Sequence, residues 1–134
     1  MKKFRFNLET VLDFRQQKEE QERQKLAKAN RTYALVQNHL TKLQERLIQE
    51  QEATEQRLTQ GANLNLLEAW QRVLYIENLQ QSVAEQKQRL QQAQREVKRC
   101  QERVIKAHQE TKVLENLKQK RWEEYWAEVN KKEQ

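Results

Sequence analysis

Apolar residues recur along the first half of the chain at alternating spacings of three and four residues. This pattern repeats every seven residues and places apolar side chains along one stripe of a helix, as in a coiled coil. We call this stripe the seam. Between residues 26 and 57, seven of the ten seam positions are apolar: Leu26, Ala29, Tyr33, Val36, Leu40, Leu43 and Leu47.

The second half of the chain carries a denser seam. Between residues 76 and 114, ten of twelve positions are apolar, whereas random placement at the overall apolar fraction of 36% would fill about four. The pattern therefore predicts a second coiled-coil helix. Its apolar positions are Ile76, Leu79, Val83, Leu90, Ala93, Val97, Cys100, Val104, Ala107 and Leu114.

One segment between the two seams favours a turn. Gly61 can adopt positive φ without steric cost and so can end a helix. Asn65, followed by Glu68, resembles a capping box that starts the next helix, and Asn7 is expected to cap the first one. Residues 1–134 are therefore predicted to form a single all-α, antiparallel two-helix coiled-coil hairpin, with helices at about 8–60 and 65–131 and a turn at about 61–64.

Pairing of the two seams sets residue i opposite a residue numbered near 125 minus i. Leu43 then lies opposite Leu79, and Leu26 lies opposite Val97 and Cys100. The same rule brings the aromatic residues of the two chain ends into one cluster, which we expect to hold the open end of the hairpin together. These residues are Phe4, Phe6, Phe14, Trp122, Tyr125 and Trp126.

The first seam weakens between residues 15 and 25, which include no apolar residue. In this segment the helix must be held by side-chain stems and by pairs four residues apart, such as Glu19 with Arg23.

Composition supports helices over sheets. Only 36% of the 134 residues are hydrophobic and 34% are charged, with one glycine and no proline. Sheet proteins need more turn-forming residues than this. The longest apolar runs have four residues, whereas a membrane span needs about 20. The first residues lack the apolar core of a secretory signal, and Cys100 alone cannot form an intrachain disulfide, so a cytoplasmic protein is expected.

The net charge of +6 is spread evenly along the sequence. Residues 1–61 have 12 basic and 9 acidic side chains, and residues 62–134 have 14 and 11, so each part carries +3. Nucleic-acid-binding proteins usually concentrate positive charge on one face. A basic helical nucleic-acid-binding protein is therefore a less favoured alternative than a solvated coiled coil.

Catalytic and cofactor chemistry is not expected. A two-stranded coiled coil has no cavity that could hold a substrate, and a phosphate-binding loop needs several glycines. His39 and His108 are too far apart in the expected register to share a metal ion, and each is expected to be solvated. Cys100 occupies a seam position and is expected to be buried and inert. The sequence therefore predicts a protein that is not an enzyme and binds no metal or cofactor.

Apolar residues just after the turn exceed what one seam can cover. They are Trp70, Val73, Leu74, Tyr75 and Ile76. Either a second face of the hairpin is covered by another protein, or the core is wider at the tip.

The two chain ends resemble those of a known family. The opening Phe4-Arg5-Phe6-Asn7-Leu8-Glu9-Thr10-Val11-Leu12 has an F-x-F-x-L-x-x-V-L pattern that is similar to the start of the flagellar export proteins of the FliJ family. The stretch from Leu114 to Tyr125 resembles the family's closing stretch. Length, basic charge, coiled-coil halves and the turn agree with this resemblance.

This resemblance implies a non-enzymatic stalk of the flagellar type III protein export apparatus. Members of the family are antiparallel coiled coils that resemble the gamma-subunit stalk of the rotary ATP synthase. They insert into the hexameric export ATPase and contact the cytoplasmic domain of the export gate FlhA and export chaperones. The implied location is the cytoplasmic face of the inner membrane at the flagellar base, and the chain is expected to be monomeric in isolation.

The resemblance also implies two contact regions. Matching the family's gate-contacting stretch selects Leu43, Tyr75 and Leu79, while Arg46 and Glu50 stand where the family can carry tyrosines. Analogy with the gamma stalk places the paired termini in the ATPase pore. The residues at that end are Lys2, Lys3, Arg5, Arg121, Trp122 and Trp126.

One further alternative is a generic adaptor whose two seams pair between chains. A stable dimer in light scattering would favour it.

Overall fold

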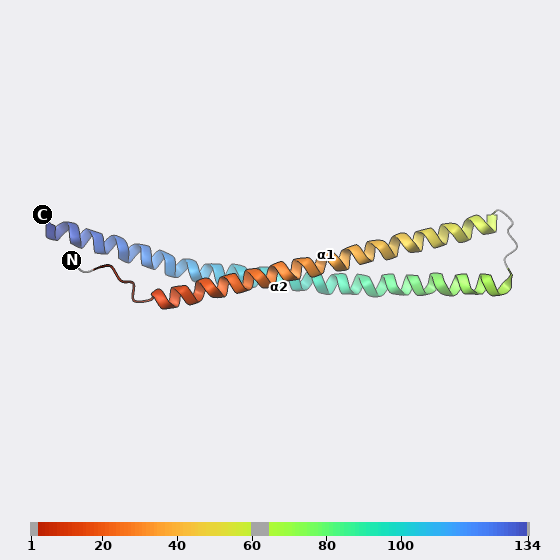
Figure 1. Cartoon of the computed structure of the whole chain (residues 1–134), viewed down its shortest axis with the longest axis horizontal. Coiled ribbons are helices and arrows are strands. Elements are labelled where there is room, and N and C mark those ends of the chain that lie inside the picture. Colours follow the sequence, from red (N-terminus) through yellow and green to blue (C-terminus); the bar gives the residue numbers. More distant parts are fainter. Residues whose placement is uncertain (1–2, 60–64, 134) are drawn as a thin grey trace. The chain divides into compact units, whose positions relative to one another are not determined.

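The computed structural model describes residues 3–59 and 65–133. Helix α1 covers Glu9–Thr59 and helix α2 covers Leu66–Glu133, with no strand in these ranges (Figure 1). The two helices pack against each other, which confirms the predicted all-α helical hairpin. Each helix end lies within two residues of its predicted position. The predicted turn at 61–64, including Gly61, lies outside the described residues.

The chain divides into two compact units. Unit 1 combines Met1–Lys28 with Lys98–Gln134, and unit 2 is Ala29–Val97. Both units therefore contain a segment of α1 and a segment of α2.

Unit 1 is held by polar contacts whose order shows an antiparallel pair. Lys118 Nζ lies 2.8 Å from Glu9 Oε2, Arg15 lies 2.8 Å from Glu110, and His108 lies 2.7 Å from Glu19. Partners on α2 have lower numbers as α1 advances. The contacts confirm the rule that residue i faces a residue near 125 minus i.

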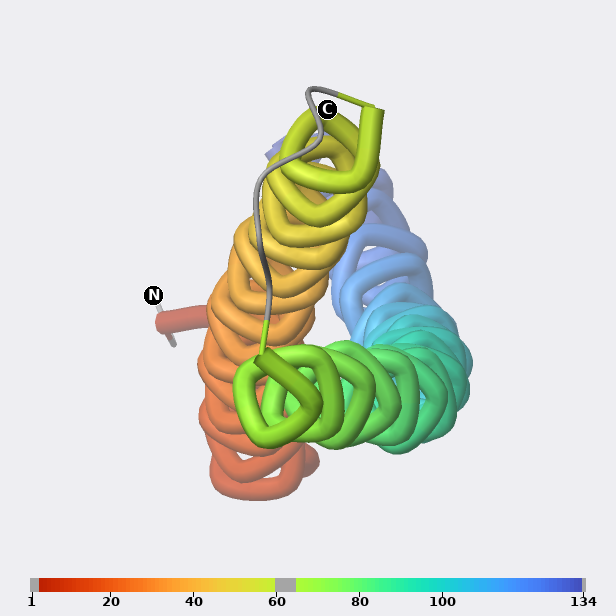
Figure 2. Tube along the Cα trace, turned by 90° about the vertical axis from the view of Figure 1, so that its right-hand side faces the viewer, coloured from red at the N-terminus to blue at the C-terminus, as the bar shows by residue number. Residues whose placement is uncertain are grey.

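Unit 2 follows the same rule. Gln86 Nε2 donates to the carbonyl oxygen of Val36 at 3.2 Å, and Arg72 donates to Thr54 Oγ1 at 3.3 Å. The last turns of α1 and the first turns of α2 lie at the same end of this unit (Figure 2).

Burial follows the apolar pattern. Every seam position between 26 and 57 and between 76 and 114 is buried or half-buried except Arg57. Gln86 and Thr111, the two polar positions of the second seam, are among the most deeply buried residues. No large side chain in the described ranges is completely enclosed, because each helix buries only one stripe. Such an interface stabilises the fold mainly through the apolar area that each unit removes from water.

The helix starts differ in how they are capped. The amide N–H of Glu68 donates to Asn65 Oδ1 at 2.7 Å, which confirms the predicted cap of α2. The prediction for Asn7 was wrong. Helix α1 begins at Glu9, whose N–H donates to the carbonyl oxygen of Phe6 at 3.1 Å. Asn7 Oδ1 instead accepts a hydrogen bond from Arg121 of α2, so a contact between distant segments replaces the local cap.

Neither helix, over the residues described, has a stretch apolar and long enough to cross a bilayer.

Candidate functional site

An aromatic cluster joins the N-terminal segment of unit 1 to the end of α2. The ring of Phe4 lies 5.1 Å from Trp122, edge to face, and 5.6 Å from Tyr125. Trp126 extends the cluster at 5.4 Å from Trp122. These contacts confirm the predicted pairing of Phe4 with Trp122. Trp122 and Trp126 remain 40% and 41% exposed, so the cluster also presents aromatic surface to solvent.

Cationic side chains surround this cluster. Arg121 lies 5.8 Å over the ring of Phe6, which is buried, and donates to Asn7. Lys3 and Arg5 are exposed, whereas Lys2 lies outside the described residues. The end of unit 1 therefore combines exposed indoles with positive charge, a composition favoured in protein interfaces.

Phe14 does not belong to the cluster, contrary to the prediction. Its side chain is 60% exposed. Leu12 and Arg15 occupy the neighbouring seam positions, so Phe14 points away from the stripe that faces α2. The helical spacing of three and four residues accounts for this exposure.

The predicted gate-contact residues of unit 2 differ in their exposure to solvent. Tyr75 is 37% exposed, with the guanidinium of Arg46 at 6.0 Å over its ring. Leu43 is half-buried, and Leu79 is buried. Tyr75 is therefore available to a partner, whereas Leu79 lies within the helix interface and supports α2 from inside.

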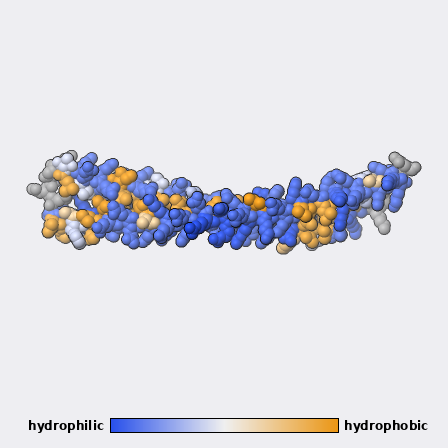
Figure 3. Space-filling model, turned by 180° about the vertical axis from the view of Figure 1, so that it is seen from behind, coloured by the Kyte–Doolittle hydropathy of each residue, from blue (hydrophilic) through white to orange (hydrophobic). Residues whose placement is uncertain are grey.

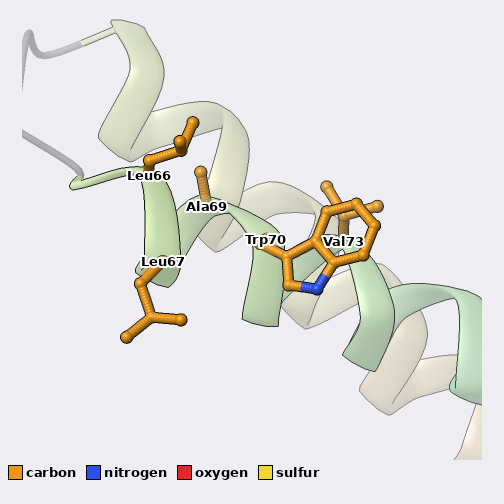
Figure 4. A pocket seen from close by; sticks show the side chains of 5 residues that line it. All are labelled: Leu66, Leu67, Ala69, Trp70 and Val73. Carbon is orange, nitrogen blue, oxygen red and sulfur yellow. The ribbon is translucent and has the colours of Figure 1, made fainter.

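A second apolar surface, here called the tip patch, lies at the start of α2. Leu66 is 90% exposed and Trp70 is 61% exposed. Figure 3 shows hydrophobic atoms gathered toward this end of unit 2. The side chains of Trp70 and Val73 lie side by side, while Leu66 and Leu67 point in different directions (Figure 4). The tip patch consists of Leu66, Leu67, Ala69, Trp70 and Val73.

The tip patch and Tyr75 lie on different sides of α2. Trp70 and Tyr75 are five residues apart, which corresponds to about 140° around a helix. The seam residue Ile76 is half-buried, as is Arg72. The alternative of a wider local core is thus wrong for Trp70, Val73 and Leu74, because these side chains are exposed.

The seam of unit 1 continues through polar residues. Arg15, Glu19 and Glu22 follow the same spacing of three and four residues back from Leu26, and all are half-buried or buried. Arg15 pairs with Glu110, and its carbonyl oxygen accepts from Thr111 Oγ1 at 3.2 Å. The weak segment is therefore held by ion pairs and hydrogen bonds. The predicted pair of Glu19 with Arg23 is confirmed at 2.8 Å.

Two carboxyl groups in this polar seam have altered pKa values. Hydrogen bonds from Arg23 and His108 lower the pKa of Glu19. Burial raises the pKa of Glu22, but the hydrogen bond from Lys18 and the charges of Lys25, Lys18 and Arg103 outweigh burial, so the net shift is downward. One oxygen of Glu22, Oε2, is buried without a hydrogen-bond partner in the described part of the chain.

Cys100 and the two histidines differ in their exposure to solvent. Cys100 is buried at 3% exposure, as its seam position predicts. His39 is exposed in unit 2, and His108 of unit 1 contacts Glu19 with half of its side chain exposed. Within residues 3–59 and 65–133, no three His, Cys, Asp or Glu side chains converge as a metal site requires.

The spacing of apolar residues does not predict several of the residues that lie between the helices. Arg15, Glu19 and Glu22 carry charge, and only an extension of the seam spacing past Leu26 places them between the helices. The stacking of Arg46 on Tyr75 follows from no local pattern, since it needs the register of the two helices.

The fold and its surfaces define a two-helix coiled-coil protein that exposes aromatic and charged side chains to solvent. A sequence model of the flagellar FliJ protein matches residues 4–134. The chain therefore belongs to the FliJ family. Comparisons with curated proteins and with solved structures found no match.

Membership of this family connects the chain with flagellar biogenesis and with the flagellar protein export apparatus. The family is a non-catalytic component of that apparatus.

Proposed function

We propose that the whole chain, residues 1–134, acts as one stalk that couples the export ATPase to the export gate. Its paired termini would insert into the ATPase hexamer, and unit 2 would contact the cytoplasmic domain of FlhA. The observation that carries this proposal is the family match over residues 4–134, on a chain whose described residues form two paired helices. The stalk would work at the cytoplasmic face of the inner membrane at the flagellar base.

The ATPase contact is proposed for the cationic and aromatic end of unit 1. Trp122 and Trp126 supply exposed indole rings, and Arg121, Lys3 and Arg5 supply positive charge beside them. Lys2 belongs to the same proposed contact. Aromatic residues and arginine are favoured anchors in protein interfaces.

The gate contact is proposed for Tyr75, with Leu43 and Leu79 beneath it. Tyr75 is exposed, and the guanidinium of Arg46 lies over its ring at 6.0 Å, within the range of a cation–π contact. The tip patch adds apolar surface to the same end of unit 2. Because Leu79 is buried, we expect it to act by positioning α2 rather than by touching the gate. Export chaperones would bind the remaining exposed surface, with the chain otherwise monomeric.

A pair of variants tests the gate contact. Tyr75→Ala is expected to weaken binding to the purified FlhA cytoplasmic domain by about tenfold or more, because truncation of a tyrosine anchor removes about 1.4 kcal/mol or more. Leu35→Ala is the control, because Leu35 is an exposed apolar residue elsewhere in unit 2. Circular dichroism should show unchanged helicity in both variants. Equal affinity of Tyr75→Ala and the unaltered chain would remove the gate assignment.

A reciprocal experiment separates the two ends. The double variant Trp122→Ala with Trp126→Ala is expected to lose binding to the export ATPase while keeping gate binding. Trp70→Ala is expected to keep ATPase binding. If both variants weaken the same partner to the same degree, the two ends do not have separate roles. Light scattering that shows a stable dimer would instead favour the self-associating adaptor.

A further inference from the structure

The net positive charge of the chain is concentrated in one of its two units. Unit 1 contains 18 Lys and Arg residues against 12 Asp and Glu residues, a net charge of +6. Unit 2 contains 8 of each sign and is neutral. The linear sequence hides this difference, because folding brings the start and the end of the chain into the same unit.

Part of this charge lines a surface hollow between α1 and α2 of unit 1. Two carboxylates, Glu22 and Glu110, lie among its cationic side chains. The hollow draws on both helices, so its shape depends on the packing of the pair. Its five cationic side chains are Arg15, Lys18, Lys25, Arg103 and Lys106.

The cations of α1 are already partnered. Arg15 pairs with Glu110 at 2.8 Å. Lys18 and Lys25 lie 3.4 Å and 3.6 Å from the same oxygen of Glu22. The carboxylates of the hollow therefore neutralise charge mainly on the α1 side.

The cations of α2 make no such close ion pair, although the charge of Arg103 acts on Glu22 from a longer distance. Arg103 and Lys106 are exposed, three residues apart and so on neighbouring turns of one helix face. In the described part of the chain, neither has a carboxylate within 4.0 Å. Two adjacent cations at the edge of a basic hollow are thus left to attract an external anion.

We propose that this hollow binds a carboxylate-rich segment of a partner protein, with Arg103 and Lys106 as its anchors. The planar guanidinium of Arg103 suits two-point hydrogen bonding to a carboxylate. The surface includes none of the residues proposed above for the ATPase or the gate. It is therefore distinct from those two contacts, and its failure would leave both of them intact.

The carboxylates of the hollow favour an acidic protein segment over a nucleic acid. A nucleic-acid backbone carries a negative charge at each phosphate and has no donor there. It would be repelled where Glu22 and Glu110 interrupt the cations. A peptide can place its carboxylates on Arg103 and Lys106 and turn neutral groups or N–H donors toward the two glutamates.

The test uses the full-length chain and, as the probe, an octapeptide in which glutamate alternates with glycine, at low ionic strength. Binding is expected to weaken as salt rises, and to shift the amide NMR signals of residues 15–25 and 103–110. The double variant Arg103→Glu with Lys106→Glu should lose about tenfold in affinity. If this variant folds poorly by circular dichroism, Arg103→Gln with Lys106→Gln removes the same charges and should lose about threefold.

The matched control is Lys87→Glu with Arg89→Glu in unit 2. It replaces the same residue types at exposed positions and changes the net charge equally. It should alter the affinity for the same glutamate–glycine peptide by less than about twofold. Equal losses in the two double variants would overturn the proposal, because net charge alone would then explain binding. A single-stranded octanucleotide whose binding depends more strongly on Arg103 and Lys106 would identify a nucleic-acid site instead, and would also overturn it.

Discussion

Glu19 of α1 contacts one side chain of each helix at a single oxygen atom. His108 Nδ1 of α2 lies 2.7 Å from Glu19 Oε1, and Arg23 donates to the same oxygen at 2.8 Å. Glu19 therefore connects a contact within α1 to a contact between the helices. This junction lies in the segment that has no apolar residue.

Glu19 is expected to make the stability of unit 1 depend on pH. Because its folded pKa is lowered from 4.5, its contribution is present above that value and is lost as pH falls through the folded pKa. Glu19→Gln should reduce the free energy of unfolding by about 1 kcal/mol at pH 7, and the difference from the unaltered chain should shrink below pH 4.5. Urea denaturation of both chains at pH 7 and below pH 4.5 measures this difference in the free energy of unfolding. Glu20→Gln is the exposed control, and an equal, pH-dependent loss in that variant would contradict the role of Glu19.

Glu22 is expected to cost stability at its seam position. A buried carboxylate with one oxygen lacking a hydrogen bond is less favourable than a packed apolar side chain of similar size. Glu22→Leu should therefore raise the midpoint of thermal unfolding. A lower midpoint would show that the contacts with Lys18 and Lys25 outweigh the desolvation of the carboxylate.

The aromatic cluster is expected to stabilise the open end of unit 1. Phe4→Ala should lower the free energy of unfolding by about 1–2 kcal/mol, because it removes a half-buried ring that contacts Trp122 and Tyr125. Tryptophan fluorescence should shift to longer wavelength as the indoles become more hydrated. Phe14→Ala is the control and should change stability by less than about 0.5 kcal/mol, because Phe14 is exposed. The reverse order of the two effects would disprove the assignment.

The cap of α2 is expected to depend on the side-chain oxygen of Asn65. Asn65→Ala should cost about 1 kcal/mol in the free energy of unfolding, whereas Asn65→Asp keeps an acceptor for the Glu68 N–H and should be nearly neutral. Chemical denaturation of both variants measures the difference. Equal losses in the two variants would mean that the side-chain oxygen at position 65 is not what stabilises the helix start.

The sequence predicted the helices and their register well, because the apolar residues recur at the spacing of the helix face that is buried. Leu40, Val83 and Val104 illustrate this, since each is buried at an expected position. A prediction from neighbouring residues failed where a side chain from a distant segment bonded to the expected capping residue. Asn7 was expected to cap α1, yet Arg121 takes its side-chain oxygen.

Parts of the candidate sites could not be predicted because they depend on how segments far apart in the chain meet. The two halves of the sequence have equal charge, whereas the folded units carry +6 and zero. The sequence does not indicate a basic site at Arg103 and Lys106, because the site forms only when the fold brings Lys18 and Lys25 of α1 into the same hollow. Exposure of Trp70 and burial of Leu79 likewise follow from helix packing, not from hydrophobicity.

The central claim is that one polypeptide pairs its own ends. Spin labels at the exposed positions Asp13 and Lys112 of unit 1, on a Cys100→Ser background, test it by pulsed electron paramagnetic resonance. Helices packed about 8–10 Å apart predict a label separation of about 2–3 nm that persists when labelled chains are diluted with excess unlabelled chains. A separation near 15 nm, about that of a single continuous helix, or loss of the short distance on dilution would contradict the hairpin.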